Sequence, residues 1–229
     1  GRVVYVTTLN DAGPGSLRQA LVGETGPRIV MFRVSGTIEL ASRLQLIGED
    51  NSYVTLAGET SPGGIQVRGY WLELTGGVHD VIARHLLFRP GIDEDGWMQW
   101  DGRGCQRPPE GCADMIQEDA SIKDAVAVRH ASNVILDHIS AQWALDETVS
   151  MGPETHDVTL QWSNIGEGSM MGHPELGHSN GFLLGGPSRV SVHHTLLTDF
   201  AARVPRVTSI ELFQWINNVQ YNNVENALL

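Results

Sequence analysis

The sequence has no long hydrophobic run and carries little positive charge. No stretch approaches the roughly eighteen consecutive apolar residues of a membrane-spanning helix, so we expect no membrane partner. Lys and Arg number 15 against 27 Asp and Glu, which gives a formal net charge of −12. Because nucleic acid is held mainly by Lys and Arg, this balance argues against nucleic acid as a ligand. An acidic ligand would require cations concentrated at one place on the surface.

Cysteine is almost absent. The two cysteines, Cys105 and Cys112, enclose the segment QRPPEG. Such close spacing in a loop with two prolines is typical of a small loop closed by a disulfide, which indicates a secreted, extracellular protein. Two free thiols in a surface loop are the alternative interpretation. A zinc site would need further ligands close by, and none has the required spacing.

Long helical patterns are also missing. The chain of 229 residues is 41% hydrophobic, which is enough for one sizeable core, and no linker divides it. We therefore expect a single domain over residues 1–229. Ser16 is expected to cap one short helix, LRQAL at 17–21, whose apolar side chains would cover an exposed end of a sheet. The rest of the pattern is a series of short strands and turns, beginning with the strands expected at 3–8, 29–32 and 37–40.

An internal repeat is the strongest architectural signal. Six apolar segments recur with a basic period in the low twenties, and the longest step holds an insertion at 93–121 that is expected to project as a loop. Short strands that cannot bury their own faces predict coils stacked in a solenoid, and the β character favours a parallel β-helix. A β-sandwich is the alternative fold. The aligned segments begin at Val54, Val81, Val134, Val158, Val190 and Phe213.

The segment 133–147, NVILDHISAQWALDE, combines an apolar strand with an Asp-His pair and an acidic pair. Side chains alternate between the two faces of a strand, so the strand carries the Asp137 carboxylate on the face opposite its buried residues. Asp137 and His138 are candidate catalytic residues. The more common interpretation of such a pair at a strand end is hydrogen bonding on a wetted face.

Stacked coils align residues of the same phase in files along the outer surface. Arg84, Asp137 and Gln161 share one phase, so we expect a polar file that suits a long linear ligand. The pairs Asn217-Asn218 and His193-His194 are interpreted as a structural ladder or a solvated row.

Several motifs, in order along the chain, resemble the pectate lyase family of polysaccharide lyases. The segment 8–21, TLNDAGPGSLRQAL, resembles the N-terminal cap found in these and other β-helix proteins. LAGETSPGGIQVRG and HLLFRPG resemble the early coils, and NVILDH resembles the family's Val-Trp-Ile-Asp-His signature. HHTLLTDFAARVPRV resembles the segment that carries the catalytic Arg-x-Pro. The resemblance covers nearly the whole chain.

This resemblance implies an all-β, right-handed parallel β-helix with a short N-terminal capping helix. It also implies a secreted enzyme that cleaves polygalacturonate by β-elimination, with Ca²⁺ as its cofactor. Arg203 matches the family's catalytic arginine, which is taken as the base that removes the C5 proton of a galacturonosyl residue. A second family arginine falls on Thr208, and Arg206 is expected to supply part of that charge to the substrate.

The remaining site residues also follow from the resemblance. Asp124 and Asp146 match calcium-ligand aspartates, and a third acidic ligand falls on Gln142, whose amide oxygen calcium can accept. A family segment in which Lys contacts the substrate carboxylate has Asn in place of that Lys here, in the segment HSNG at 178–181. His178 and Asn180 are therefore candidate substrate-binding residues.

Two other functions stay open. A non-catalytic β-helix that only binds polysaccharide is favoured by the departures at Thr208, Asn180 and Gln142. A lyase of methyl-esterified pectin would replace calcium by an arginine, and the sequence between Asp137 and Asp146 has none.

The last segment, INNVQYNNVENALL, keeps the repeat pattern, and Ile216 and Val219 are expected to face the core. No polar cap follows them, although the terminal coils of a solenoid normally need one. We therefore expect a C-terminally truncated chain, or self-association through the uncapped end.

Overall fold

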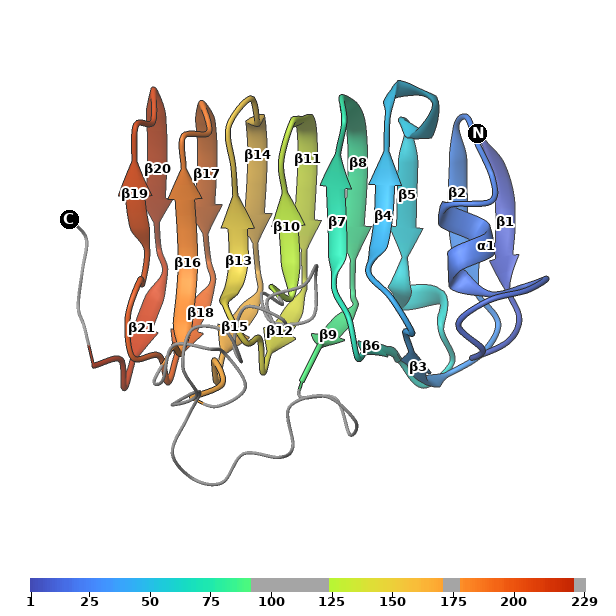
Figure 1. The fold of residues 1–229 in the computed structure, drawn as a ribbon, viewed down its shortest axis with the longest axis horizontal. Helices are drawn as coiled ribbons and strands as arrows, with labels where there is room; N and C mark the ends of the chain where they lie inside the picture. The colour runs from blue at the N-terminus through green and yellow to red at the C-terminus, as the bar shows by residue number, and fades with distance from the viewer. Residues whose placement is uncertain (92–123, 171–177, 225–229) are drawn as a thin grey trace, which may run out of the picture.

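The computed structural model describes residues 1–91, 124–170 and 178–224, and these residues form a β-helix of stacked coils. The strands belong to three sheets, and neighbouring strands pair in parallel. Figure 1 shows the coils following one another along the long axis, from the N-terminus to the C-terminus. Spatial neighbours within a sheet are one coil apart along the chain, as a solenoid requires. The predicted all-β parallel β-helix is confirmed.

The sheets contain the following strands in spatial order. The eight-stranded sheet contains β1 (Arg2–Val6), β2 (Arg28–Phe32), β5 (Val54–Ala57), β8 (Val78–Arg84), β11 (Ala131–Asp137), β14 (His156–Gln161), β17 (Arg189–His193) and β20 (Leu212–Ile216). The six-stranded sheet contains β4 (Leu44–Ile47), β7 (Leu72–Thr75), β10 (Val126–Val128), β13 (Glu147–Met151), β16 (Asn180–Gly185) and β19 (Arg206–Thr208). The seven-stranded sheet contains β3 (Gly36–Glu39), β6 (Ile65–Arg68), β9 (Leu87–Arg89), β12 (Ser140–Gln142), β15 (Asn164–Gly166), β18 (Leu196–Thr198) and β21 (Val219–Tyr221).

The strands alternate between the core and the surface. In β11, Val134 and Leu136 are fully buried, whereas Ile135 between them is 37% exposed. The same phase continues from coil to coil, because the six predicted repeat segments pair in register. The paired positions are Val54, Val81, Val134, Val158, Val190 and Phe213. The sequence repeat therefore corresponds to the eight-stranded sheet.

The helix α1 (Leu17–Leu21) covers the N-terminal end of the stack (Figure 1). Ser16 caps it as predicted, since its side chain accepts a hydrogen bond from the backbone N–H of Gln19. The apolar residues of the helix are buried. Arg28, the first residue of β2, is 1% exposed and donates to the carbonyls of residues 20 and 21 and to Asn51 Oδ1. Two short 3₁₀ helices, at residues 49–51 and 58–60, complete the helical segments that the structure describes.

Asn218 is part of the structural ladder that the sequence predicts. Its Oδ1 accepts a hydrogen bond from the backbone N–H of Thr195 at 2.9 Å, and its Nδ2 donates to the Val192 carbonyl at 2.9 Å. Both partners lie one coil earlier in the chain. Asn218 therefore satisfies backbone groups in the turn between the eight-stranded and seven-stranded sheets.

The prediction that Ile216 and Val219 face the core is wrong. Ile216 is 47% exposed and Val219 is 57% exposed. The register pairs Ile216 with His193, and alternation directs Phe213 and Trp215 toward the core instead. The two apolar side chains thus stand on the outward phase.

Cys105, Cys112 and the insertion at 93–121 lie outside the described residues, so the disulfide stays a prediction. Among the helices that the structure describes, none is long and apolar enough to cross a membrane.

Candidate active site

Four residues that can carry chemistry form one row across neighbouring strands of the six-stranded sheet. Asp124 precedes β10, Glu147 begins β13, and Asn180 begins β16 in register with Glu147. Asn180 also forms a parallel bridge to Ala202, the residue before Arg203. Because the strands are parallel, this row runs across the coils along the amino ends of the strands. Such a row suits an extended ligand that crosses several coils.

Asp124 is almost completely buried, at 2% exposure. It accepts hydrogen bonds from the Ser150 hydroxyl and, at 3.2 Å, from the backbone N–H of Glu147. Arg129 Nη2 lies 3.5 Å from its Oδ2. Burial, with a smaller contribution from the nearby charge of Asp146, raises the pKa of Asp124 to about 7 against the opposing hydrogen bond from Ser150. A bound cation would favour the ionised carboxylate at this position.

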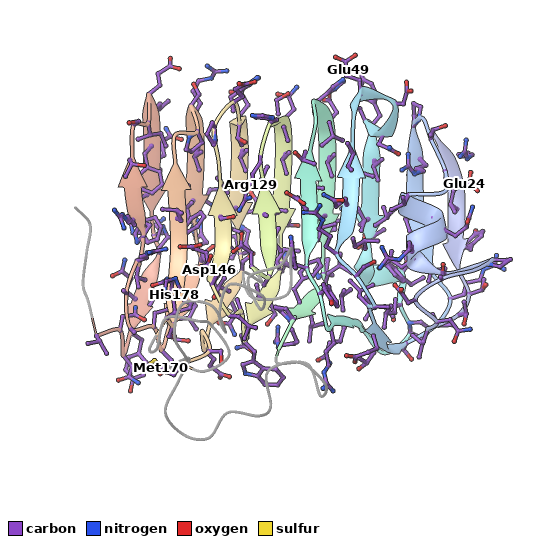
Figure 2. The ribbon with its side chains drawn as sticks, in the orientation of Figure 1. Glu24, Glu49, Arg129, Asp146, Met170 and His178 are labelled. Atoms are coloured by element: carbon purple, nitrogen blue, oxygen red, sulfur yellow. The ribbon has the colours of Figure 1, made fainter. Side chains whose placement is uncertain are left out.

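Asp146, Glu147 and His178 form a cluster in which one ligand atom of each lies within 4.8 Å of the others. His178 Nε2 and Asp146 Oδ1 are 2.7 Å apart, and Glu147 is 3% exposed. Figure 2 shows Asp146 and His178 beside each other near the amino ends of neighbouring strands. The two carboxylates, with Asp124 next in the row, offer the oxygen ligands that calcium prefers. The imidazole hydrogen-bonds to Asp146, which is the arrangement of an outer partner that orients a ligand.

Arg203 forms an ion pair with Glu147 through Nη1 and Oε1. The Arg203 side chain is 26% exposed, so it reaches solvent from the same row. Its carbonyl accepts a hydrogen bond from the Phe182 N–H at 2.6 Å. A Cβ at Gly181 would lie 2.9 Å from the Arg203 carbonyl oxygen, so glycine is needed for this close approach. The backbone of β16 thus fixes the segment that carries Arg203.

Asn180 and Arg206 flank Arg203. Asn180 is 4% exposed, and its Nδ2 is a buried donor that has no hydrogen-bond acceptor among the described residues. Arg206 begins β19 and is exposed, two strand positions before the exposed Thr208. The Thr208 hydroxyl donates to the Leu184 carbonyl at 3.2 Å, which ties it to the sheet. Arg206 is therefore an exposed cation three residues after Arg203 in the chain.

Gln142 lies on a different sheet from the other predicted calcium ligands. It ends β12 of the seven-stranded sheet, is half-buried, and pairs with Gly166. The chain then turns toward the six-stranded sheet and reaches Asp146 four residues later. Gln142 thus stands outside the row of carboxylates.

Asp137 and His138 are placed on the eight-stranded sheet, outside the row that contains Arg203. Asp137 Oδ1 lies 2.8 Å from His138 Nδ1 and accepts a hydrogen bond from Gln161 Nε2 at 2.9 Å. Arg84, Asp137 and Gln161 pair in register, which confirms the predicted file. The sequence placed the pair at a strand end, and the structure shows it hydrogen-bonded there.

Glu147 is the site residue that sequence reasoning missed. In the sequence it stands only as the second half of an acidic pair with Asp146. The structure places it at the start of a strand of the sheet that carries Asp124, and its side chain is buried. Its partner Arg203 is 56 residues further along the chain, so no local pattern could reveal the contact.

Comparison with known proteins agrees with the resemblance in the sequence. The proteins named probable pectate lyase C from Aspergillus flavus and from Emericella nidulans are each 34% identical over 223 residues, which is 97% of this chain and 44% of theirs. This chain is a relative of the pectate lyases. It spans about half the length of the curated relatives it matches. No family model matches the sequence.

Solved structures confirm the right-handed parallel β-helix that pectate lyases share. The structure of jun a 1, the major allergen from cedar pollen, matches 97% of this chain and 63% of its own, with a TM-score of 0.63 and 14% identity. The pectate lyase Bsp165PelA from Bacillus sp. N165, solved in complex with trigalacturonate, matches 97% of this chain and 62% of its own, with a TM-score of 0.59 and 14% identity. At this level of identity the structures support the fold.

Proposed function

We propose that this pectate lyase relative cleaves polygalacturonate by calcium-assisted β-elimination. The observation that carries the proposal is the row on the six-stranded sheet, where the carboxylates of Asp124, Asp146 and Glu147 adjoin Arg203. The names of the relatives support a polysaccharide lyase, and the trigalacturonate complex of a structural neighbour supports the substrate.

The reaction needs a base and a cation on opposite sides of one sugar ring. The base takes the C5 proton, and the electrons of the C5–H bond form a double bond between C4 and C5. The bond from C4 to the glycosidic oxygen then breaks, and that oxygen takes up a proton. Negative charge develops beside an existing carboxylate, so preorganised cations contribute most to the rate. Arg203 in its deprotonated form is the proposed base, and Arg206 is proposed to bind a substrate carboxylate.

Calcium would be held by Asp146 and Glu147, with Asp124 next to them. When bound, calcium would neutralise the substrate carboxylate and polarise it. His178 holds Asp146 through a hydrogen bond of 2.7 Å. We propose that His178 orients the Asp146 carboxylate. We also propose that the buried Nδ2 of Asn180 donates a hydrogen bond to the polysaccharide bound along the row.

The local charge is consistent with an acidic substrate. Arg203 and Arg206 stand at one end of the row, and Arg129 lies beside Asp124. These cations adjoin a place where calcium would add further positive charge, although the whole chain carries a net charge of −12. Because pectate belongs to plant cell walls, we propose that the protein acts outside the cell.

The test is the rise in ultraviolet absorbance that the unsaturated product causes. Polygalacturonate is incubated with the protein in the presence of calcium, and then with excess chelator. We expect a rise that depends on calcium and is lost in Arg203→Ala. Arg189→Ala is the matched control, because Arg189 is an exposed arginine on the eight-stranded sheet, and it should retain activity.

A second function is favoured by one contact. Arg203 is paired with Glu147, and a residue held by a carboxylate could serve binding alone. A β-helix that only binds polysaccharide would migrate more slowly in a gel that contains polygalacturonate, and it would give no rise in absorbance. A rise on methyl-esterified pectin that resists the chelator would identify a pectin lyase instead. Either result would overturn the calcium-assisted mechanism.

A further inference from the structure

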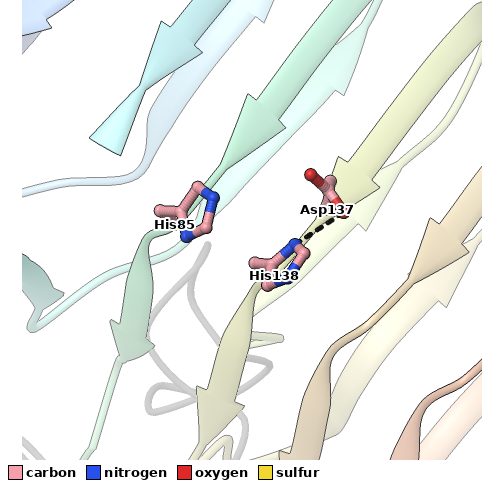
Figure 3. A group of neighbouring side chains, drawn as sticks. All are labelled: His85, Asp137 and His138. Atoms are coloured by element: carbon pink, nitrogen blue, oxygen red, sulfur yellow. Dashed lines mark hydrogen bonds and ion pairs between the residues drawn. The ribbon is translucent and has the colours of Figure 1, made fainter. Parts of the chain in front are cut away.

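Two histidines from neighbouring coils lie side by side at the carboxyl ends of two strands of the eight-stranded sheet. His85 follows β8 and His138 follows β11, with backbone φ angles of 53° and 51°. Their preceding residues, Arg84 and Asp137, pair in register. Equal phase and equal backbone conformation therefore direct the two imidazoles alike, as Figure 3 shows.

Asp137 completes a group of three metal-binding side chains. One ligand atom each from His85, Asp137 and His138 lies within 4.8 Å of the others. Asp137 Oδ1 contacts His138 Nδ1 and Gln161 Nε2, and these two contacts leave Oδ2 for a cation. When the neutral His138 carries its proton on Nε2, the Nδ1 lone pair lies beside the Asp137 carboxylate, so one cation can bind both groups.

We propose that His85, Asp137 and His138 bind a divalent transition-metal ion of the zinc class. Two imidazoles with one carboxylate suit zinc, nickel or copper, whereas calcium and magnesium prefer sites made of oxygen alone. The imidazoles stack with centroids 4.5 Å apart and planes 22° apart, so binding one ion requires a rotation about the side-chain bonds that turns both lone pairs toward it. Both histidines are exposed, which permits that rotation.

A cavity lies on the surface beside these three side chains. A shallow cavity of about 480 Å³ is bordered by His85, His138, Trp162 and His194, with small polar and aliphatic side chains between them. Trp162 stacks on His194 at 4.2 Å between centroids, so the far wall is aromatic. A metal ion at the other wall would keep open positions toward the cavity, where water or a small anionic ligand can complete its coordination.

This site is independent of the proposed lyase centre. Its ligands come from the eight-stranded sheet, whereas Asp146 and Glu147 belong to the row on the six-stranded sheet. It also differs in ligand chemistry, because it has two imidazoles for one carboxylate. The loss of one site therefore does not imply the loss of the other.

The experiment is a calorimetric titration with ZnCl₂ at about pH 7.5, where imidazole is neutral. It uses an Asp146→Ala background, which removes the second cluster that contains a histidine. We expect one zinc ion per chain, with affinity at least about tenfold lower in His85→Ala and in His138→Ala. The matched control is His79→Ala. His79 has an equivalent contact of 2.6 Å with Asp80 but stacks on Tyr53 instead of a second imidazole.

Spectroscopy tests the ligand set directly. Copper(II) bound to the same background protein should show electron paramagnetic resonance couplings to two imidazole nitrogens, and His85→Ala should reduce them to one. Circular dichroism of each variant establishes that it is folded. Absence of binding in the background protein, or an equal loss of affinity in His79→Ala, would overturn the proposal. Titration with CaCl₂ should show no binding at these residues.

Discussion

The carboxylate of Glu147 contacts the Arg203 guanidinium and also belongs to the cluster with Asp146 and His178. A cation bound to the cluster would compete with Arg203 for the same oxygens. We predict that Glu147→Gln lowers calcium affinity by about tenfold or more, because the site loses one of its charges. Calorimetry with CaCl₂ measures this, and the exposed Glu154→Gln is the control. Unchanged affinity would show that Glu147 serves Arg203 alone.

The same contact has a consequence for stability. Glu147 is buried and Arg203 is partly exposed, so removing the carboxylate leaves a guanidinium that water compensates only in part. We predict that Glu147→Gln lowers the free energy of unfolding by about 1–3 kcal/mol. Denaturant unfolding of both single variants and of Glu147→Gln/Arg203→Ala tests it. The double variant should lose less than the sum of the singles, and strict additivity would contradict the coupling.

Asn218 shows how a single side chain holds one element to the next. It bonds the N–H of Thr195, a residue that is 1% exposed, and the carbonyl of Val192. Asn218→Ala would leave buried backbone groups without partners, so we predict a loss of about 1–3 kcal/mol in unfolding free energy. Asn217→Ala is a matched neighbour whose contact with His194 is exposed, and it should change stability little. Equal losses in both variants would contradict the ladder.

Ion pairs link β14, β17 and β20 near their amino ends. Asp157 lies within 2.6 Å of Arg189, which also contacts Glu211. Hydrogen bonds from Arg189 and His156 hold the pKa of Asp157 well below its ordinary value. A lowered carboxyl pKa stabilises the fold above the ordinary pKa, and this contribution is lost as the pH falls through the folded-state value.

We therefore predict that Asp157→Asn lowers the melting temperature slightly at neutral pH. The difference from wild type should shrink as the pH falls below about 4, where this carboxylate becomes protonated in the unfolded chain, and should vanish as the pH falls through the folded-state pKa. The effect is small because the pair is exposed to solvent. Thermal melts across this pH range measure it, with the exposed Glu49→Gln as control. A difference that grows on acidification would contradict the assignment.

Over the whole molecule, the features that the sequence predicts correctly are those encoded by a few neighbouring residues. The repeat positions such as Val134 pair as expected, and Ser16 caps the helix, because alternation and capping are encoded within a few residues. The prediction for Ile216 is wrong because its segment is apolar on both phases, so alternation alone does not determine which face is buried. The contact of Glu147 with Arg203 depends on how coils stack, which no short window of sequence specifies.

The stacking of the coils also determines how far the destabilising effect of a substitution extends along the molecule. Arg28 joins α1 to the first coils, and burial, with the nearby charge of Arg2, lowers its pKa. Arg28→Met would remove the donors that satisfy the last carbonyls of the helix. In a solenoid each coil contacts only its neighbours, so we predict faster amide hydrogen exchange in α1, β1 and β2 and near wild-type protection in β14 and β17. Arg33→Met is the control, since that arginine lies on the exposed face over Tyr5. Exchange that rises equally in every strand would show instead that the coils open as one cooperative unit, and the terminal helix would then stabilise the entire β-helix rather than its first turns.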